Sequence, residues 1–75
     1  MLTLPDYIDQ TGDEDVARIL NKGRPPEEHI TTRTVMSWRL KTRLPRKEHA
    51  SLIVKRCPVS YEGIYSVERK LDHST

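Results

Sequence analysis

Residues 30–41 read Ile-Thr-Thr-Arg-Thr-Val-Met-Ser-Trp-Arg-Leu-Lys, and this stretch decides the predicted fold. The hydroxyl of Thr31 or Thr32 can accept a hydrogen bond from a free backbone N–H at the start of a helix. No Gly or Pro interrupts the residues that follow. The stretch therefore predicts a helix of about two turns over residues 32–40.

This predicted helix has two different faces. Val35 and Trp38 lie three residues apart and share one face, whereas Arg33, Ser37 and Lys41 are spaced by four along another. We expect the first face to pack into the core and the second to be polar, basic and short enough to enter a groove. Trp38 has an alternative role as an exposed platform for base stacking. Its spacing from Val35 favours the core.

The same stretch carries a resemblance to a known family. The order Ile30-Thr31-x-x-Thr34-Val35-x-x-Trp38 resembles the second half of a helix-turn-helix of the phage Cro and repressor type. The resemblance continues through the element after the recognition helix, with the residues Arg43-Leu44-Pro45 and a following helix that contains Ala50 and Ile53. It covers residues 30–57.

The resemblance implies an all-α, lambda-repressor/Cro-like domain of four to five helices, which we expect to span residues 1–75 as a single unit. The resemblance also implies that Ala17 is the small residue on the first helix of the motif, which lets the recognition helix approach closely. Val35 lies eighteen positions after Ala17, a longer spacing than this family uses. The excess lies in residues 21–29, where Gly23, Pro25 and Pro26 indicate a loop. Either the turn is enlarged, or an extra helical turn begins at Pro26.

The flanking segments also follow helical patterns. Residues 3–12 predict a helix capped by Thr3 and ended by Gly12, and a second helix begins at the acidic residues 13–15. A further helix follows Pro45, with its core face at Ala50, Ile53, Val54 and Cys57. Residues 59–71 favour a helix capped by Ser60, although an exposed strand is the alternative. Residues 72–75 are expected to fray.

The formal net charge of +2 conceals a strong segregation of charge along the chain. Residues 1–30 hold seven acids and three bases, a net charge of −4, whereas residues 31–56 hold eight bases and one acid, a net charge of +7. Residues 57–75 add a net charge of −1. Such segregation is typical of a face that binds a polyanion, backed by a less basic body. The alternative to polyanion binding is an ordinary basic surface that is only solvated.

Together, the charge and the resemblance predict a sequence-specific regulator that binds double-stranded DNA, such as a phage or prophage Cro-like repressor. The helix 32–40 is expected to enter the major groove and occlude a promoter, and the residues expected to read bases are Thr32, Arg33, Met36 and Ser37. The residues expected to contact phosphates are Thr31, Thr34, Arg39, Lys41, Arg43, Arg46 and Lys47.

One short helix reads few base pairs, so we expect a homodimer on half-sites about one helical turn apart. Residues 59–71 are the candidate dimer contact, because Tyr61, Ile64, Tyr65 and Val67 exceed what so small a core can absorb. Two alternative functions stay open. One is a phage excision or architectural factor that bends DNA; the other is a protein-binding module, such as an anti-activator.

Other function classes have little support in the sequence. Ser60 lacks a nearby base and Gly23 stands in no phosphate-binding pattern, so we expect no enzyme, cofactor or small-molecule substrate. His29, His49, His73 and Cys57 show no close ligand spacing, and we expect no metal. Cys57 is expected to be a small buried hydrophobe. Residues 1–10 resemble no export signal and no segment suits a bilayer, so we expect a bacterial, nucleoid-associated cytoplasmic protein.

Overall fold

The computed structural model describes residues 2–65. Its elements are α1 (Leu4–Thr11), α2 (Asp13–Asn21), the 3-10 turn η1 (Pro26–Glu28), α3 (Thr32–Arg39), α4 (Lys47–Arg56) and α5 (Tyr61–Tyr65). Within this range β-type pairing is limited to one isolated bridge, between Leu2 and Val59. The predicted all-α class is therefore confirmed for residues 2–65. The tail predicted to fray, 72–75, lies outside the described residues.

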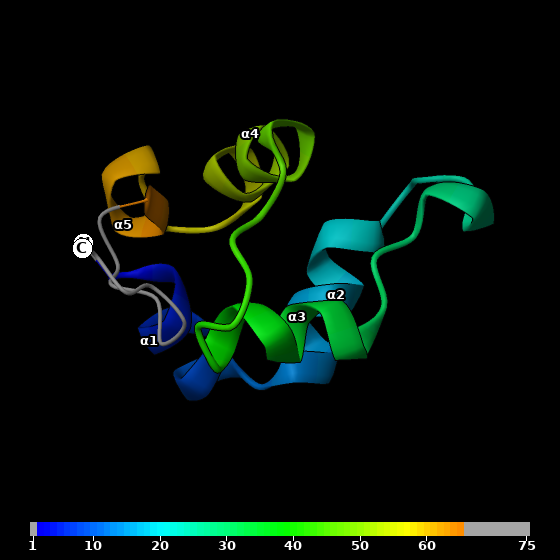
Figure 1. The fold of residues 1–75 in the computed structure, drawn as a ribbon. Helices are drawn as coiled ribbons and strands as arrows, with labels where there is room; N and C mark the ends of the chain where they lie inside the picture. Colours follow the sequence, from blue (N-terminus) through cyan, green and yellow to red (C-terminus); the bar gives the residue numbers. More distant parts are fainter. Residues whose placement is uncertain (1, 66–75) are drawn as a thin grey trace.

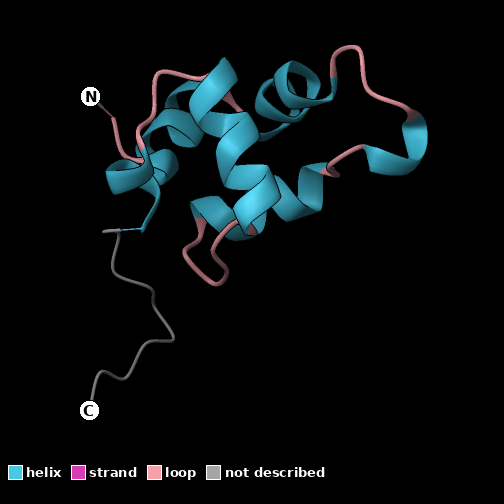
Figure 2. Ribbon diagram, turned by 90° about the horizontal axis from the view of Figure 1, so that it is seen from above, coloured by secondary structure: helices cyan, strands magenta, loops and turns pink. Residues whose placement is uncertain are grey.

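The helices pack into one body, from which a single arm projects. Figure 1 shows α1, α2 and α3 together in its lower half, with α4 and α5 across the top. Contacts join α3 to both α1 and α2, and α4 to both α2 and α5. Residues 22–29, which carry η1, leave the edge of this body and return to it (Figure 1, Figure 2). We call these residues the arm.

Local signals place α1 and α2 where the sequence predicts them. Thr3 caps α1, its hydroxyl accepting a hydrogen bond from the N–H of Asp6 at 3.3 Å. Gly12 ends α1 with φ at 107°, a conformation that glycine adopts more readily than other residues. Its N–H donates to the carbonyl of Ile8 at 2.7 Å. The acids that begin α2 lie at the positive end of its dipole.

The arm combines the two alternatives that the sequence left open. The turn between α2 and α3 is enlarged, and it also contains a helical turn, η1, that begins at Pro26. Asn21 closes the arm at its base: its amide nitrogen donates to the carbonyl of Ile30 at 2.9 Å, and its amide oxygen accepts from the N–H of Ile30 at 2.7 Å. These paired bonds bring the chain back to the helical body just before α3.

Arg56, in the last turn of α4, also contacts the carboxyl end of α2. At that position in α4 a cation opposes the dipole of its own helix. The guanidinium of Arg56 donates to three carbonyls around the end of α2, those of Ile19, Leu20 and Lys22, at 3.1, 3.4 and 2.7 Å. These carbonyls have lost their intrahelical partners, so a cation satisfies them and opposes the local dipole. Arg56 therefore ties α4 to α2.

After α4 the chain turns into α5, whose described part is helical as predicted. Ser60 caps it by accepting a hydrogen bond from the N–H of Gly63 at 3.1 Å. α4 itself begins at Lys47, two residues after Pro45, with Arg46 as the preceding cap residue. The remainder of the helix predicted over 59–71, including Val67, lies outside the described residues.

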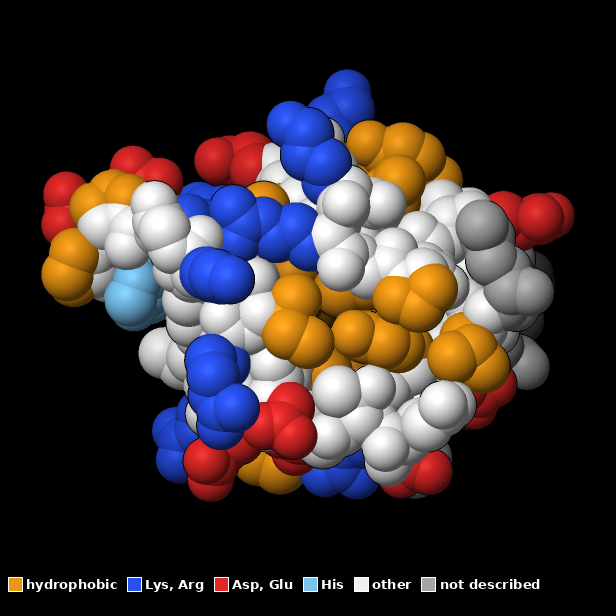
Figure 3. Space-filling view, turned by 180° about the vertical axis from the view of Figure 1, so that it is seen from behind, with side chains coloured by type: hydrophobic (Ala, Val, Ile, Leu, Met, Phe, Trp, Pro, Cys, Tyr) orange, Lys and Arg blue, Asp and Glu red, His pale blue; other side chains and the backbone are white. Residues whose placement is uncertain are grey.

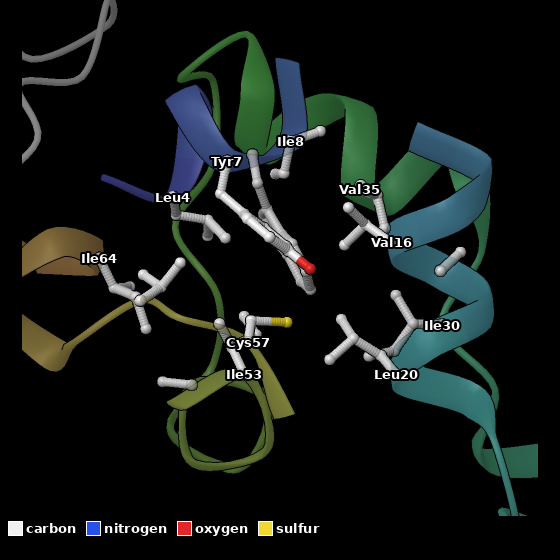
Figure 4. Close-up of a cluster of buried hydrophobic side chains, with 14 residues drawn as sticks. Leu4, Tyr7, Ile8, Val16, Leu20, Ile30, Val35, Ile53, Cys57 and Ile64 are labelled. Carbon is white, nitrogen blue, oxygen red and sulfur yellow. The ribbon is translucent and has the colours of Figure 1, made fainter. Parts of the chain in front are cut away.

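One apolar core joins all five helices (Figure 4). Tyr7, Leu20, Val35 and Ile53 project into it from four different helices. The predicted core face of α4 is confirmed at Ala50, Ile53 and Cys57, whereas Val54 is only partly buried, as is Ile19 of α2. Ile64 corrects one expectation: it is 1% exposed and belongs to this core, so it is not available to a dimer contact.

Candidate nucleic-acid interface

The first turn of α3 is fixed by two threonines. The hydroxyl of Thr31 accepts a hydrogen bond from the N–H of Thr34 at 3.1 Å, and the two hydroxyls lie 2.9 Å apart. Thr31 is therefore the cap residue, one of the two that the sequence proposed, while Thr32 is the first helical residue. Leu40 follows the helix as its C-cap, so α3 ends one residue earlier than predicted.

The inward face of α3 is buried, as predicted. Val35 is 0% and Trp38 is 3% exposed. The indole therefore has no free face on which a base can stack, and that alternative role for Trp38 is wrong. The indole also lies beside the ring of His49, with ring centroids 6.0 Å apart and planes inclined by 55°. Because these two core residues set the rotation of α3, a residue on the opposite side of the helix, such as Arg33, faces outward.

The four residues predicted to read bases differ in how freely they project. Thr32 and Arg33 are exposed, and Arg33 makes no hydrogen bond or ion pair within residues 2–65. Met36 and Ser37 are half-buried. The hydroxyl of Ser37 donates to the carbonyl of Thr34 at 2.6 Å, so it is already used inside the helix. Arg33 is accordingly the longest free polar side chain on this face.

The end of α3 adopts a strained conformation that places a cation. Lys41 has φ at 65°, in the left-handed region that favours glycine. Its N–H donates to the carbonyl of Trp38 at 3.2 Å, and the next N–H, that of Thr42, donates to the carbonyl of Ser37 at 3.1 Å. This pair of bonds is a Schellman motif, which satisfies carbonyls at the helix end. The exposed side chain of Lys41 then begins the loop to α4.

Arg39 differs from the other predicted phosphate contacts, because it pairs with an acid. Its Nε and one Nη donate to the two carboxylate oxygens of Asp13, at 2.9 and 3.1 Å. This two-point contact raises the pKa of Arg39 from its ordinary value. It also joins the first turn of α2 to the last turn of α3. Arg39 therefore has a structural partner in the acidic part of the chain.

Four exposed cations follow α3 and surround the start of α4. We call them the cationic rim: Lys41, Arg43, Arg46 and Lys47. Within residues 2–65 none of them forms an ion pair or donates a side-chain hydrogen bond. Arg43, Arg46 and Thr34 line one hollow at the surface. The structure therefore brings part of the predicted phosphate-contacting set together with the first turn of α3.

Other residues at this hollow were not predicted as part of the site, and two of them affect its charge. Arg24, from the arm, and His49, from α4, also line it. Burial lowers the pKa of His49, and the nearby charges of Arg24 and Arg46 lower it further, whereas Glu48 opposes them. Arg24 could have been found from its position in the loop that lengthens the turn before α3. It was missed because residues 1–30 carry a net negative charge.

The face turned away from the viewer in Figure 1 carries hydrophobic side chains. Seen from behind, hydrophobic side chains gather in the middle of that face, with Lys and Arg side chains to one side of them (Figure 3). Elsewhere on the surface, Tyr61 and Tyr65 of α5 are 49% and 44% exposed. Both tyrosines are thus free to contact another molecule, as the candidate dimer segment requires.

The chemistry-bearing groups elsewhere are built into the core. Cys57 is buried, and burial raises the pKa of its thiol, while the hydroxyl of Tyr7 bonds to it and lowers that pKa in part. Burial likewise raises the pKa of Tyr7. Among residues 2–65 no three His, Cys, Asp or Glu side chains gather as a metal site requires. Nor does this part of the chain hold a helix of the length and apolarity needed to cross a membrane.

Comparison of the chain with protein-family models, with curated proteins and with solved structures finds no match.

Proposed function

We propose that this protein is a sequence-specific regulator that binds double-stranded DNA through α3, in the manner of a phage Cro-like repressor. In this proposal α2 and α3 are the two helices of a helix-turn-helix whose turn is enlarged by the arm. The observation that carries it is the rotation of α3. With Val35 and Trp38 buried, Thr32 and Arg33 stand exposed on the outer side of the helix.

The cationic rim gives this face the charge that a duplex requires. Each of its four side chains is exposed and without an ion pair inside residues 2–65. Cations in this condition can neutralise phosphates and release counterions, which supplies most of the affinity for any duplex. A guanidinium such as that of Arg33 can add sequence preference by pairing with O6 and N7 of guanine. Phosphate contacts would position the protein, and Arg33 would read the sequence.

The acids at the start of α2 leave this face open. Asp13 pairs with Arg39, and Asp15 pairs with Arg18 on α2, where their nitrogen and oxygen atoms lie 3.1 Å apart. Neither contact involves Arg33 or the cationic rim. Repression would follow by occlusion, because a helix seated in the major groove of a promoter denies that site to polymerase.

A dimer on two half-sites belongs to the same proposal. A single short helix covers few base pairs, and two copies on one face of the duplex double the sequence that is read. Tyr61 and Tyr65 support a contact through α5, because two large aromatic side chains are exposed there on one short helix.

The test is binding to duplex DNA, followed by selection from a random duplex pool. We expect binding to a random duplex at low salt that weakens steeply as salt is raised, and a selected sequence with two related half-sites. An absence of duplex binding at low salt would refute the proposal and favour a module that binds protein. A selected pool without sequence preference would reduce the function to non-specific binding.

A further inference from the structure

The arm, α3 and the start of α4 enclose a hollow of about 360 Å³, which is lined mostly by polar groups. Three arginines from separate segments reach it: Arg24 from the arm, Arg43 from the loop after α3, and Arg46 from the cap of α4. The hydroxyl-bearing residue Thr34, in the first turn of α3, lines it as well. Convergent guanidinium groups beside a helix N-terminus suit an anion with several oxygens, such as a phosphate.

Arg24 is held in the arm, but its hydrogen bonds are incomplete. Its side chain is 22% exposed, and one Nη donates to a carboxylate oxygen of Glu28 at 3.3 Å. Its Nε is buried and has no hydrogen-bond partner within the described residues. A buried donor without a hydrogen-bond partner is unfavourable. If this guanidinium moves toward a better acceptor, it therefore loses little hydrogen-bond stabilisation.

The partner of Arg24 is also weakly held. The side chain of Glu28 is 57% exposed, and its bond to Arg24 is a single, long contact rather than a two-point pair. Ion pairs of this kind contribute little to stability, so a phosphate can replace the carboxylate. By contrast, Arg43 and Arg46 have no acidic partner within residues 2–65 and need no such exchange.

The remaining charges determine which anion the hollow suits. Glu27, Glu28 and Glu48 line it too, and these three carboxylates offset the three arginines. Two histidines, His29 and His49, complete the titratable groups there. A free anion gains little from a balanced site of this kind. A backbone phosphate of a bound duplex differs from a free anion. When α3 lies in the groove, the other contacts of the duplex bring this phosphate to the hollow, so the hollow does not have to attract it alone.

We propose that this hollow binds one backbone phosphate of the duplex that α3 binds. On binding, Arg24 exchanges its ion pair with Glu28 for a contact with this phosphate. The inference rests on the proposed function and deepens it. It makes the arm a second DNA-contacting element, and Arg24 a phosphate contact contributed by the acidic part of the chain. Glu28 is then an internal competitor of the phosphate.

Opposite effects of two substitutions test this inference. The affinity of the full chain for a random duplex is measured by fluorescence anisotropy at several salt concentrations. Arg24→Ala should weaken binding about 5- to 10-fold and reduce the salt slope by about one, the share of one phosphate. Glu28→Gln should tighten binding about 2- to 5-fold, because it releases Arg24.

Glu27→Gln is the matched control, since it removes the same charge one residue away without freeing Arg24. Its effect should be clearly smaller than that of Glu28→Gln. Equal effects of the two glutamine variants would overturn the inference, and so would weaker binding by Glu28→Gln, which would show that the Arg24–Glu28 pair only supports the arm. If Arg24→Ala does not fold, the comparison of Glu28→Gln with Glu27→Gln still tests the inference.

Failure of this inference is distinct from failure of the proposed function. If the unsubstituted chain binds no duplex, both are refuted. If it binds a selected sequence and Arg33→Ala abolishes that preference, while changes at Arg24 and Glu28 leave affinity and salt slope unchanged, only the hollow is refuted as a phosphate site. Inorganic phosphate alone, added at constant ionic strength, should leave the melting temperature unchanged.

Discussion

The side-chain amide of Asn21 makes two hydrogen bonds with the backbone of Ile30, nine residues further along the chain, and so closes the arm at its base. This amide replaces a backbone partner, since it offers one donor and one acceptor to a chain segment that belongs to no helix. Ile30 is buried directly beside the start of α3. The position of α3 therefore depends on a contact made from the end of α2.

Asn21→Ala should destabilise the fold by about 1–3 kcal/mol, because it leaves the N–H and carbonyl of Ile30 without these partners in a partly buried place. Chemical denaturation followed by circular dichroism measures the change in the free energy of unfolding. Arg18→Ala is the control: it removes an exposed ion pair from the same helix and should shift stability by no more than about 0.5 kcal/mol. Equal stability of both variants would contradict the role assigned to Asn21.

Lys41 offers a substitution in which stability and DNA binding should change in opposite directions. Lys41→Gly should stabilise the fold by about 1 kcal/mol, because glycine adopts φ near 65° without the penalty of a Cβ. The same change removes a cation from the rim and should weaken duplex binding at low salt. Lys41→Ala should weaken binding equally without stabilising the fold, which separates the two effects. Denaturation and anisotropy measure them.

The contacts at Asn21 and Lys41 mark the limit of what the sequence could predict. Helix starts and ends followed from local chemistry, such as the cap at Thr3, the glycine at position 12 and the cap at Thr31. Core faces followed from spacing, because burial repeats with the period of the helix. Lys41 could not be predicted to have a positive φ, since the tertiary structure imposes a conformation that its side chain disfavours.

Contacts between distant residues were the second gap. Arg56 reaches carbonyls 34 to 37 residues earlier, and Arg39 pairs with an acid 26 residues earlier. No spacing rule predicts either partner, because it depends on how the helices cross. The same reason explains the candidate site. Segregation of charge along the chain identified Arg43 and Arg46, but it could not identify Arg24, which reaches the same hollow from the acidic third.

Gly63 illustrates a steric requirement that helical propensity alone would miss. A Cβ at this position would lie 2.8 Å from the carbonyl oxygen of Leu2, closer than side chains tolerate. Gly63→Ala should therefore destabilise the fold by about 1–3 kcal/mol, although alanine favours a helix by about 1 kcal/mol. Gly23→Ala meets no atom within 4 Å, so it isolates the cost of a positive φ, about 1 kcal/mol. A stabilised Gly63→Ala variant would contradict the close approach of these two segments.

His49 should make stability depend on pH in the weakly acidic range. Its pKa in the folded protein is lowered from the ordinary value of 6.5, mainly by burial. The unfolded chain then binds the proton first, so the free energy of unfolding should fall as pH drops below about 6.5, until the folded protein is protonated too. His49→Gln should flatten this part of the profile.

If the proposed function holds, substitutions at Arg33 and Arg46 should distinguish base reading from charge-dependent affinity. Both are exposed and without an ion pair in residues 2–65, but Arg33 projects from α3 and Arg46 caps α4. Arg33→Ala should weaken binding to the selected sequence by about 1–3 kcal/mol and binding to random DNA much less, because it removes a contact to base edges. Arg46→Ala should weaken both by similar factors and reduce the salt slope by about one.

The control for both arginines is Lys55→Ala, which removes an exposed cation near the far end of α4 and should change neither affinity strongly. Affinities for a selected duplex and a scrambled one, each measured over a range of salt, give the specificity ratio of every variant. Equal losses from Arg33→Ala on the two duplexes would remove Arg33 from the reading of bases. The preference would then have to come from Thr32, the other exposed residue of that set, or from the shape of the duplex, because Met36 and Ser37 are half-buried.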